Sequence, residues 1–220
     1  MSAAPLRLAI LLSGRGSNMQ ALVRACEDGR IAARPVLAVS DRSEALGLLR
    51  AQQLGVPTVG VPRATDAAEL ERGLTAALDA AQPDVIALAG FMRILSGEFV
   101  ARYRGRMLNI HPSLLPAYRG LHTHRRVLAA GEREHGASVH FVSRELDGGP
   151  VVLQSKVAVL SGDSEAALAA RVLATEHVIY PQALGWFATG RLTWHDDAPW
   201  LDGERLSKPL VEDFRATTLP

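Results

Sequence analysis

Leu6-Arg7-Leu8-Ala9-Ile10-Leu11-Leu12 runs without a break into Ser13-Gly14-Arg15-Gly16-Ser17-Asn18, and a helical pattern follows from Asn18 to Glu27. A short apolar run bounded by a turn signal is typical of a strand that is buried on both faces. The glycines allow the chain to turn tightly into the helix. The stretch therefore predicts the strand, turn and helix that begin a βαβ unit.

The same alternation continues through the first half of the chain. Strands are expected at 35–39, 58–61, 85–89 and 107–110, and helices at 44–54, 67–80, 97–103 and 121–130. This rhythm is typical of an α/β fold with a doubly wound, mostly parallel sheet of the Rossmann-like type. Two later strand-like runs, 137–142 and 151–159, predict an antiparallel C-terminal extension of that sheet.

The last third of the sequence contains a long helical pattern over 164–187. Pro181 is expected to make this helix irregular, because proline removes a backbone donor. Beyond residue 191 a hairpin is expected, followed by a loose end. Because no repeat, low-complexity tract or linker interrupts the pattern, residues 1–220 are expected to form a single domain.

Composition and charge exclude several classes of protein. The 220 residues are 48% hydrophobic and carry a net charge of +1, which allows a substantial core but gives no bulk attraction for nucleic acid or membranes. The single cysteine, Cys26, excludes an internal disulfide and fits a reducing compartment. The N-terminus lacks a signal-peptide pattern, and the longest apolar run, 85–92, is too short to span a bilayer. A cytoplasmic protein is expected.

The turn that follows the first strand is a candidate anion site. Backbone N–H groups at the start of a helix attract a single phosphate, and Arg15 can add positive charge. The spacing is neither GxGxxG nor a GK[ST] loop, which disfavours binding of a dinucleotide or a nucleoside triphosphate. An ordinary strand-to-helix turn capped by Ser17 or Asn18 fits the same residues equally well. Both interpretations stay open at this point.

Asn109 and His111 occupy the end of the predicted strand 107–111, which Pro112 terminates. Side chains alternate along a strand, so the amide and the imidazole face the same side while the apolar neighbours face a core. The ligand crevices of open α/β sheets lie at such strand ends. Taken alone, an asparagine at a strand end is more often a turn cap, and a lone histidine is more often structural. Together they suit the stabilisation of an oxyanion during acyl-type transfer.

Asp147 precedes Gly148 and Gly149, which permit unusual backbone angles and a close ligand approach. An aspartate in such a position is often an ordinary turn residue. Near His111, however, its carboxylate would favour the imidazolium form and could pass protons through water.

Four histidines raise the alternative of a metal site: His122, His124, His135 and His140. The sequence contains no HExxH motif, no cysteine pair and no convincing carboxylate set, so no metal is expected. His122 is expected to cap the helix that begins near residue 121, and His140 is expected on a strand facing the site.

Seven segments together resemble the phosphoribosylglycinamide formyltransferase family, over nearly the whole chain: 13–18, 89–95, 109–116, 120–124, 134–141, 145–150 and 200–203. The segment 109–116 alone marks only the wider superfamily of 10-formyltetrahydrofolate formyltransferases. The resemblance implies transfer of a formyl group from the co-substrate 10-formyltetrahydrofolate to the amine of glycinamide ribonucleotide, in de novo purine synthesis. It implies that no metal is used and that the partners are small molecules. It also implies that the protein is a monomer or a homodimer.

The resemblance also implies roles for individual residues. Asn109 and His111 would stabilise the intermediate, and Asp147 would orient His111 and assist proton transfer. The ribonucleotide would contact Gly16, Ser17, Asn18 and Glu176. The folate would contact Met92, Arg93, Ile94, Leu95, Asn109, Ser143 and Asp147. Two positions depart from the family pattern, since Arg15 replaces an asparagine of the phosphate loop and Ala67 stands where an arginine is expected to meet the folate tail.

Three alternatives compete with this interpretation. A methionyl-tRNA formyltransferase would be expected to carry a C-terminal nucleic-acid-binding domain. A formyltetrahydrofolate hydrolase would be expected to carry an N-terminal regulatory domain and would have no obvious need for a phosphate loop. A non-catalytic sensor of a sugar phosphate would leave Asn109, His111 and Asp147 idle, which makes it a poor fit.

Overall fold

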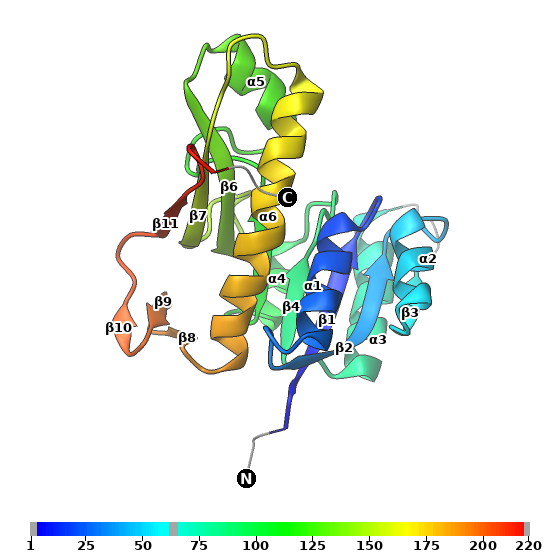
Figure 1. The fold of residues 1–220 in the computed structure, drawn as a ribbon. Coiled ribbons are helices and arrows are strands. Elements are labelled where there is room, and N and C mark those ends of the chain that lie inside the picture. The colour runs from blue at the N-terminus through cyan, green and yellow to red at the C-terminus, as the bar shows by residue number, and fades with distance from the viewer. Residues whose placement is uncertain (1–3, 62–65, 218–220) are drawn as a thin grey trace.

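An eight-stranded sheet forms the centre of the computed structural model, which describes residues 4–61 and 66–217 (Figure 1). Its strands are β1 (Leu6–Leu12), β2 (Ala33–Ser40), β3 (Thr58–Gly60), β4 (Val85–Leu88), β5 (Met107–His111), β6 (Glu134–Phe141), β7 (Val151–Ala158) and β11 (Leu210–Asp213). The helices are α1 (Ser17–Glu27), α2 (Leu46–Gln53), α3 (Ala67–Ala81), α4 (Gly97–Arg102), α5 (Thr123–Ala129) and α6 (Glu165–Ala188). A small separate sheet consists of β8 (Leu192–His195), β9 (Ala198–Leu201) and β10 (Glu204–Arg205).

The strand order of the large sheet is β11-β7-β6-β5-β4-β1-β2-β3. β1 to β5 pair with one another in parallel, whereas β6 pairs antiparallel with both β5 and β7. The predicted mostly parallel α/β sheet and its antiparallel extension are both confirmed. In the parallel part the strand order is β3-β2-β1-β4-β5, so the chain adds strands toward one edge from β1 to β3 and toward the other edge from β4 to β5. Open α/β sheets place their ligands at such a switch point, which here lies between β1 and β4.

Helices cover both faces of the sheet because both faces of its central strands are apolar. In β1, Leu8, Ile10 and Leu12 point into one buried cluster, whereas Ala9 and Leu11 point into another. Residues of α1, α2, α5 and α6 fill the first cluster, and residues of α3 and α4 fill the second. α1 and α6 pack against each other on the first face (Figure 1). The doubly wound arrangement expected from continuous apolar strands is confirmed.

α6 remains a single helix through Pro181, so the expected irregularity is wrong. Proline removes only the hydrogen bond to the carbonyl four residues earlier. The flanking residues Ile179, Tyr180, Ala183 and Leu184 are all buried in the first cluster. Their packing against the sheet outweighs the loss of one backbone bond.

The C-terminal tail is more ordered than the sequence indicates. The expected hairpin is present as β8 and β9, and β10 adds a third strand. Part of the stretch expected to be loose is ordered, because β11 pairs in parallel with β7, with Leu210 opposite Leu153, whereas residues 218–220 lie outside the described residues. β11 thereby supplies partners to backbone groups at an edge that would otherwise face solvent.

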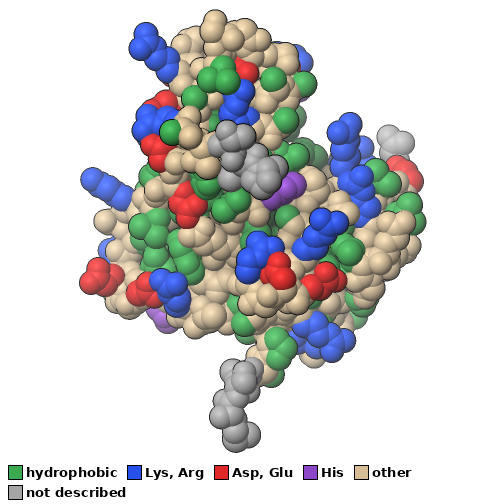
Figure 2. All heavy atoms as spheres, viewed as in Figure 1, with side chains coloured by type: hydrophobic (Ala, Val, Ile, Leu, Met, Phe, Trp, Pro, Cys, Tyr) green, Lys and Arg blue, Asp and Glu red, His purple; other side chains and the backbone are tan. Residues whose placement is uncertain are grey.

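The surface and the single cysteine agree with the composition. On the face drawn in Figure 2, Lys and Arg side chains are interspersed with Asp and Glu rather than gathered in one patch.

Cys26 lies in α1, where burial, followed by the charges of Asp28 and Glu27, raises the pKa of its thiol to about 12. Within residues 4–61 and 66–217, no helix has the length and apolar character needed to cross a bilayer.

Gly136 provides a test of the β6–β7 pairing. A Cβ built on Gly136 would lie 1.7 Å from the backbone oxygen of Ser155 in β7, so the strands would have to move apart. We expect Gly136→Ala to lower the free energy of unfolding, measured by urea denaturation, by about 3 kcal/mol or more. Gly14→Ala is the matched control, because nothing lies within 4 Å of its Cβ position. Equal stabilities of the two variants would contradict the close approach.

Candidate active site

Two adjacent pockets open at the carboxyl ends of the central strands. The first lies at the reversal point between β1 and β4 and is lined by Ser13, Gly14, Arg15, Gly16, Ser17, Asn18, Arg42, Ala89, Gly90 and Met92. The second lies beyond β4 and β5 and is lined by Leu88, Phe91, Arg93, Ile94, Leu95, Val100, Asn109, His140 and residues 142–147. Because the segment 88–95 contributes to both, the two pockets lie side by side.

The loop of the first pocket is held against α2 through its carbonyl groups. The backbone N–H of Gly47 donates to the Gly14 carbonyl (3.0 Å), and the Arg50 guanidinium donates to the Arg15 carbonyl (2.8 Å). Gly16 has a φ of 76°, and a Cβ on it would lie 2.7 Å from the Cα of Gly47. Glycine is therefore required at Gly16, both for its left-handed backbone and for this close contact.

The start of α1 carries no side-chain cap. The N-cap residue is Gly16, so the expectation that Ser17 or Asn18 caps an ordinary turn is wrong. The first N–H groups of a helix have no partner within the helix and carry partial positive charge. With the carbonyls of Gly14 and Arg15 bonded to α2, this end of the first pocket suits an anion.

Glu176 of α6 joins the glycine loop at its inner end. The Asn18 side-chain N–H donates to Glu176 Oε2 at 2.6 Å, and both residues are buried. Burial raises the pKa of Glu176, and the hydrogen bond from Asn18 opposes that shift. Asn18 Oδ1 is also buried and has no partner within the described part of the chain. The structure thus brings together the four residues for which the resemblance implies ribonucleotide contacts.

Two of the three candidate catalytic side chains, those of Asn109 and Asp147, line the second pocket, and the third, that of His111, contacts Asp147. His111 Nδ1 lies 3.4 Å from Asp147 Oδ2. Asn109 does not touch Asp147 directly, but both approach His140, whose Nε2 lies 3.0 Å from Asn109 Nδ2 and 3.8 Å from Asp147 Oδ1. Asn109 and Asp147, which are 38 positions apart in the sequence, therefore lie around the same histidine.

His140 determines the orientation of the Asn109 amide. Burial lowers the pKa of His140 to about 4, against the hydrogen bond that its Nδ1–H donates to the Phe141 carbonyl. The ring is therefore neutral at neutral pH, and its Nε2 accepts from the Asn109 amide. The sequence places His140 near the site but gives it no function. The signal is the register of the antiparallel pair, in which Asn109 lies directly opposite His140.

Both ring nitrogens of His111 face oxygen acceptors. Nε2 lies 3.0 Å from the Tyr118 carbonyl, and Nδ1 faces the Asp147 carboxylate. The Gly120 N–H also donates to Asp147 Oδ2, at 2.9 Å. A carbonyl and a carboxylate only accept hydrogen bonds, so the ring is the donor in either contact.

The turn around Asp147 differs from the expectation in one respect. The left-handed backbone lies at Asp147 itself (φ 48°), not at Gly148 or Gly149. Gly149 is required for a different reason, because a Cβ there would lie 1.8 Å from the Phe141 carbonyl oxygen. The glycine therefore permits close contact between two backbone segments rather than an unusual backbone angle.

The residues implied in folate binding separate into two groups. Arg93, Ile94, Leu95 and Ser143 line the second pocket together with Asn109 and Asp147. Met92 lines the first pocket instead, and its backbone N–H donates to Ser13 Oγ at 2.8 Å. Its side chain is 62% exposed and lies beside the boundary between the pockets.

Two of the other histidines that raise the metal alternative, His124 and His135, form a pair. His124 Nδ1 lies 3.0 Å from His135 Nε2, and burial lowers the pKa of both rings, that of His135 to about 4. His122 occupies the N-cap position of α5, as expected, but its side chain makes no capping hydrogen bond. Among the residues that the structure describes, no group of three or more His, Cys, Asp or Glu side chains is arranged to hold a metal ion.

Comparison with known proteins identifies the family. The model of the formyl transferase family matches residues 6–184. A phosphoribosylglycinamide formyltransferase of Escherichia coli (strain K12) is 53% identical over 203 residues, which cover 91% of this chain and 96% of that relative. This chain belongs to the phosphoribosylglycinamide formyltransferase family. The chain is accordingly an enzyme of the one-carbon transferase class, as the sequence motifs indicate.

Solved structures of phosphoribosylglycinamide formyltransferases have the same fold. The protein of this name from Coxiella burnetii superimposes with a TM-score of 0.89 at 46% identity, covering 94% of this chain and 99% of that one. A formyltetrahydrofolate deformylase from Pseudomonas syringae pv. tomato superimposes with a TM-score of 0.83, covering 90% of this chain and 66% of that one. At 23% identity, that second likeness shows the shared fold alone.

The buried histidines make stability depend on pH. His135 and His140 have an ordinary pKa of 6.5 that falls to about 4 in the folded chain, so the unfolded chain binds more protons between these values. The free energy of unfolding should therefore fall as the pH is lowered from about 6.5 to about 4, by up to ~1.4 kcal/mol per pH unit for each histidine.

Urea denaturation across this range tests the assignment. In His135→Asn, the free energy of unfolding should depend less steeply on pH than in the parent. In His195→Asn, a change on the exposed end of β8, the dependence should be the same as in the parent. Identical slopes for the parent and the His135 variant would show that burial does not hold this ring neutral.

Proposed function

We propose that this chain transfers the formyl group of 10-formyltetrahydrofolate to the amine of glycinamide ribonucleotide, in the biosynthesis of purines. The products are tetrahydrofolate and N-formylglycinamide ribonucleotide. The observation that carries the proposal is the convergence of Asn109, His111 and Asp147 beside a pocket whose glycine loop suits a phosphate. No other arrangement of polar side chains noted above adjoins both pockets.

The two pockets fit the two substrates. In the first, the N–H groups at the start of α1, from Gly16 to Asn18, bind the phosphate, and Arg15 and Arg42 add positive charge to the same pocket. Glu176 and the unpartnered Asn18 Oδ1 accept hydrogen bonds from the rest of the ribonucleotide. When the phosphate and the rest of the ribonucleotide are bound in this way, the glycinamide amine points toward the second pocket.

The second pocket suits the folate. Leu88, Leu95, Val100 and Val142 give it apolar walls for a flat heterocycle, while the backbone of residues 143–147 supplies polar groups at its edge. Arg93, Ile94 and Ser143 complete the lining. Met92 contacts the substrates where the pockets meet, rather than enclosing the heterocycle.

Transfer proceeds through a tetrahedral intermediate. The amine nitrogen attacks the formyl carbon, a carbon–nitrogen bond forms, and the carbonyl electron pair moves to oxygen. The Asn109 N–H donates to this oxyanion, and a ring N–H of His111 donates to it in exchange for the Tyr118 carbonyl that the ring faces in the absence of substrate. The amine proton passes to the Asp147 carboxylate through water and from there to N10 of the folate. The carbonyl re-forms as the bond to N10 breaks, which releases tetrahydrofolate.

We also propose a domain organisation, a location, an oligomeric state and a set of partners for the protein. Residues 1–220 form one domain that acts in the cytoplasm as a monomer or homodimer on small molecules, without nucleic acid and without a metal. The single cysteine suits a reducing compartment. On the face drawn in Figure 2, the interspersed charges do not form the continuous basic track that nucleic acid would need.

Release of folate from 10-formyltetrahydrofolate distinguishes the competing functions. We expect tetrahydrofolate to appear only when glycinamide ribonucleotide is present. Equal release without the ribonucleotide would identify a hydrolase, and no release in either case would favour a phosphate sensor. Measurement of formate alongside N-formylglycinamide ribonucleotide separates hydrolysis from transfer directly.

Replacement of the convergent residues tests their roles. His111→Ala and Asp147→Ala should each lower kcat by at least about 100-fold, because each removes a group that acts on the transition state. The double variant should lose much less than the product of the two factors, since the groups act as a unit. His195→Ala, distant in β8, is the control. Near-normal kcat in a folded His111 variant would refute the assignment.

A further inference from the structure

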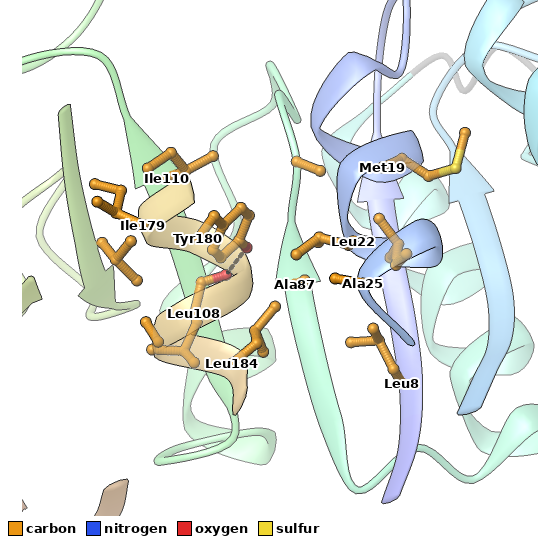
Figure 3. Close-up of a cluster of buried hydrophobic side chains, with 14 of the residues drawn as sticks. Leu8, Met19, Leu22, Ala25, Ala87, Leu108, Ile110, Ile179, Tyr180 and Leu184 are labelled. Atoms are coloured by element: carbon orange, nitrogen blue, oxygen red, sulfur yellow. Dashed lines mark hydrogen bonds between the residues drawn. The ribbon is translucent and has the colours of Figure 1, made fainter. Parts of the chain in front are cut away.

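The hydroxyl group of Tyr180 joins two strands of the large sheet. Tyr180 lies in α6 and is completely buried. Its hydroxyl lies 3.1 Å from the Leu88 carbonyl. It also lies 2.9 Å from the Leu108 carbonyl, the contact drawn as a dashed line in Figure 3. Because burying a hydroxyl without a partner is costly, these two contacts explain how a tyrosine is tolerated among apolar side chains.

Both carbonyls belong to peptide groups of residues that line the second pocket, Leu88 and Asn109. Leu88 is the last residue of β4, and the Leu108 carbonyl is part of the peptide group that joins Leu108 to Asn109. Leu88 and Asn109 are paired across β4 and β5, and both line the pocket. This pair is also the last one between the two strands, since β4 ends there while β5 continues to His111. The hydroxyl therefore bridges the strands where their ladder stops.

The same helix reaches the other pocket. Glu176 precedes Tyr180 by four residues, so the two side chains lie on one face of α6. Glu176 accepts from Asn18 in the first pocket, whereas Tyr180 contacts the backbone beneath the second. α6 thus contacts Asn18 of the first pocket and, four residues later, the backbone of the two strands that lead to the second.

Tyr180 does not act on the substrates itself. Burial raises the pKa of its phenol well above the usual value, and the group has no exposed surface. Its influence must therefore pass through the peptide groups that it contacts. Those groups precede Asn109 on one strand and the pocket segment from Ala89 onward on the other.

We propose that Tyr180 is a positioning residue for formyl transfer. Its hydroxyl fixes the separation of β4 and β5 at their carboxyl ends, and this holds the Asn109 amide at the place where the oxyanion develops. The inference rests on the proposed function, because it assigns Asn109 to that reaction. It adds a residue from α6 that touches neither substrate.

Tyr180→Phe keeps the ring and removes only the hydroxyl. We expect kcat to fall about tenfold, the factor that corresponds to ~1.4 kcal/mol of transition-state stabilisation. The KM for each substrate should stay within about twofold, because the pockets remain and only an interaction made in the transition state is weakened. The position of the melting transition is recorded for every variant.

Thr175→Val is the matched control. Thr175 is a fully buried residue of the same helix, and its hydroxyl contacts Ser155 Oγ (2.7 Å) and the Val172 carbonyl (2.8 Å), away from β4 and β5. We expect a comparable loss of stability with kcat within about twofold of the parent. An equal loss of kcat in the two variants would reduce Tyr180 to a structural role and overturn the proposal.

A double-variant comparison tests whether Tyr180 acts through Asn109. In an Asn109→Ala background, Tyr180→Phe should cause no further fall in kcat, since the group that it positions is gone. The full tenfold loss in both backgrounds would overturn the proposal. If the Phe variant does not fold, Tyr180→Met removes the hydroxyl donor and introduces a more adaptable side chain. A normal kcat in that folded variant would also overturn the proposal.

A spectroscopic measurement separates this inference from the proposed function. If the parent protein performs no formyl transfer, the proposed function fails. The NMR resonances of the Asn109 side-chain amide still report on Tyr180 in that case. They should shift in Tyr180→Phe and stay in place in Thr175→Val. Unchanged Asn109 resonances in the Phe variant would contradict the positioning role whatever the activity.

Discussion

β6 returns antiparallel beside β5 and sets His140 directly opposite Asn109. The other parts of the site depend on this pairing. It fixes the amide through a neutral ring, and the turn that follows β6 carries Asp147 back to His111. If β6 slipped by one residue, its side chains would exchange faces, and His140 would leave the pocket. The glycines at 136 and 149 permit the close backbone contacts that hold this part of the sheet in register.

The site combines buried groups of different charge, and each has a specific reason to be tolerated. His140 is neutral because burial lowers its pKa, while His111 lies between a carboxylate and a carbonyl. Glu176 is buried with a single hydrogen bond from Asn18. Such incompletely satisfied polar groups cost stability and are concentrated at functional sites. The apolar clusters on both faces of the sheet supply the stability that offsets this cost.

The sequence alone predicts most of the fold, because its strands are apolar runs and its helices are periodic. β1, β4 and β5 were identifiable from local pattern, as were Asn109 and His111 at a strand end. Features that depend on distant partners were not predictable. The parallel pairing of β11 with β7 and the continuity of α6 through Pro181 follow from tertiary packing.

The same distinction applies to the site. The role of His140 required the register of β5 and β6, which no local motif encodes. Met92 lies in the other pocket because its backbone bonds to Ser13, a contact between residues 79 positions apart. The motifs were sufficient to assemble the residue set, whereas the contacts within that set came from the structure.

The central claim is that one reactive carbon lies among Asn109, His111 and Asp147 while a phosphate occupies the glycine loop. A crystal structure with glycinamide ribonucleotide and an unreactive analogue of 10-formyltetrahydrofolate tests it most directly. The account predicts the formyl-equivalent oxygen about 3 Å from Asn109 Nδ2 and from a His111 ring nitrogen, with the phosphate at the start of α1. A formyl-equivalent group more than about 6 Å from both side chains, in a complex with both ligands fully bound, would contradict it.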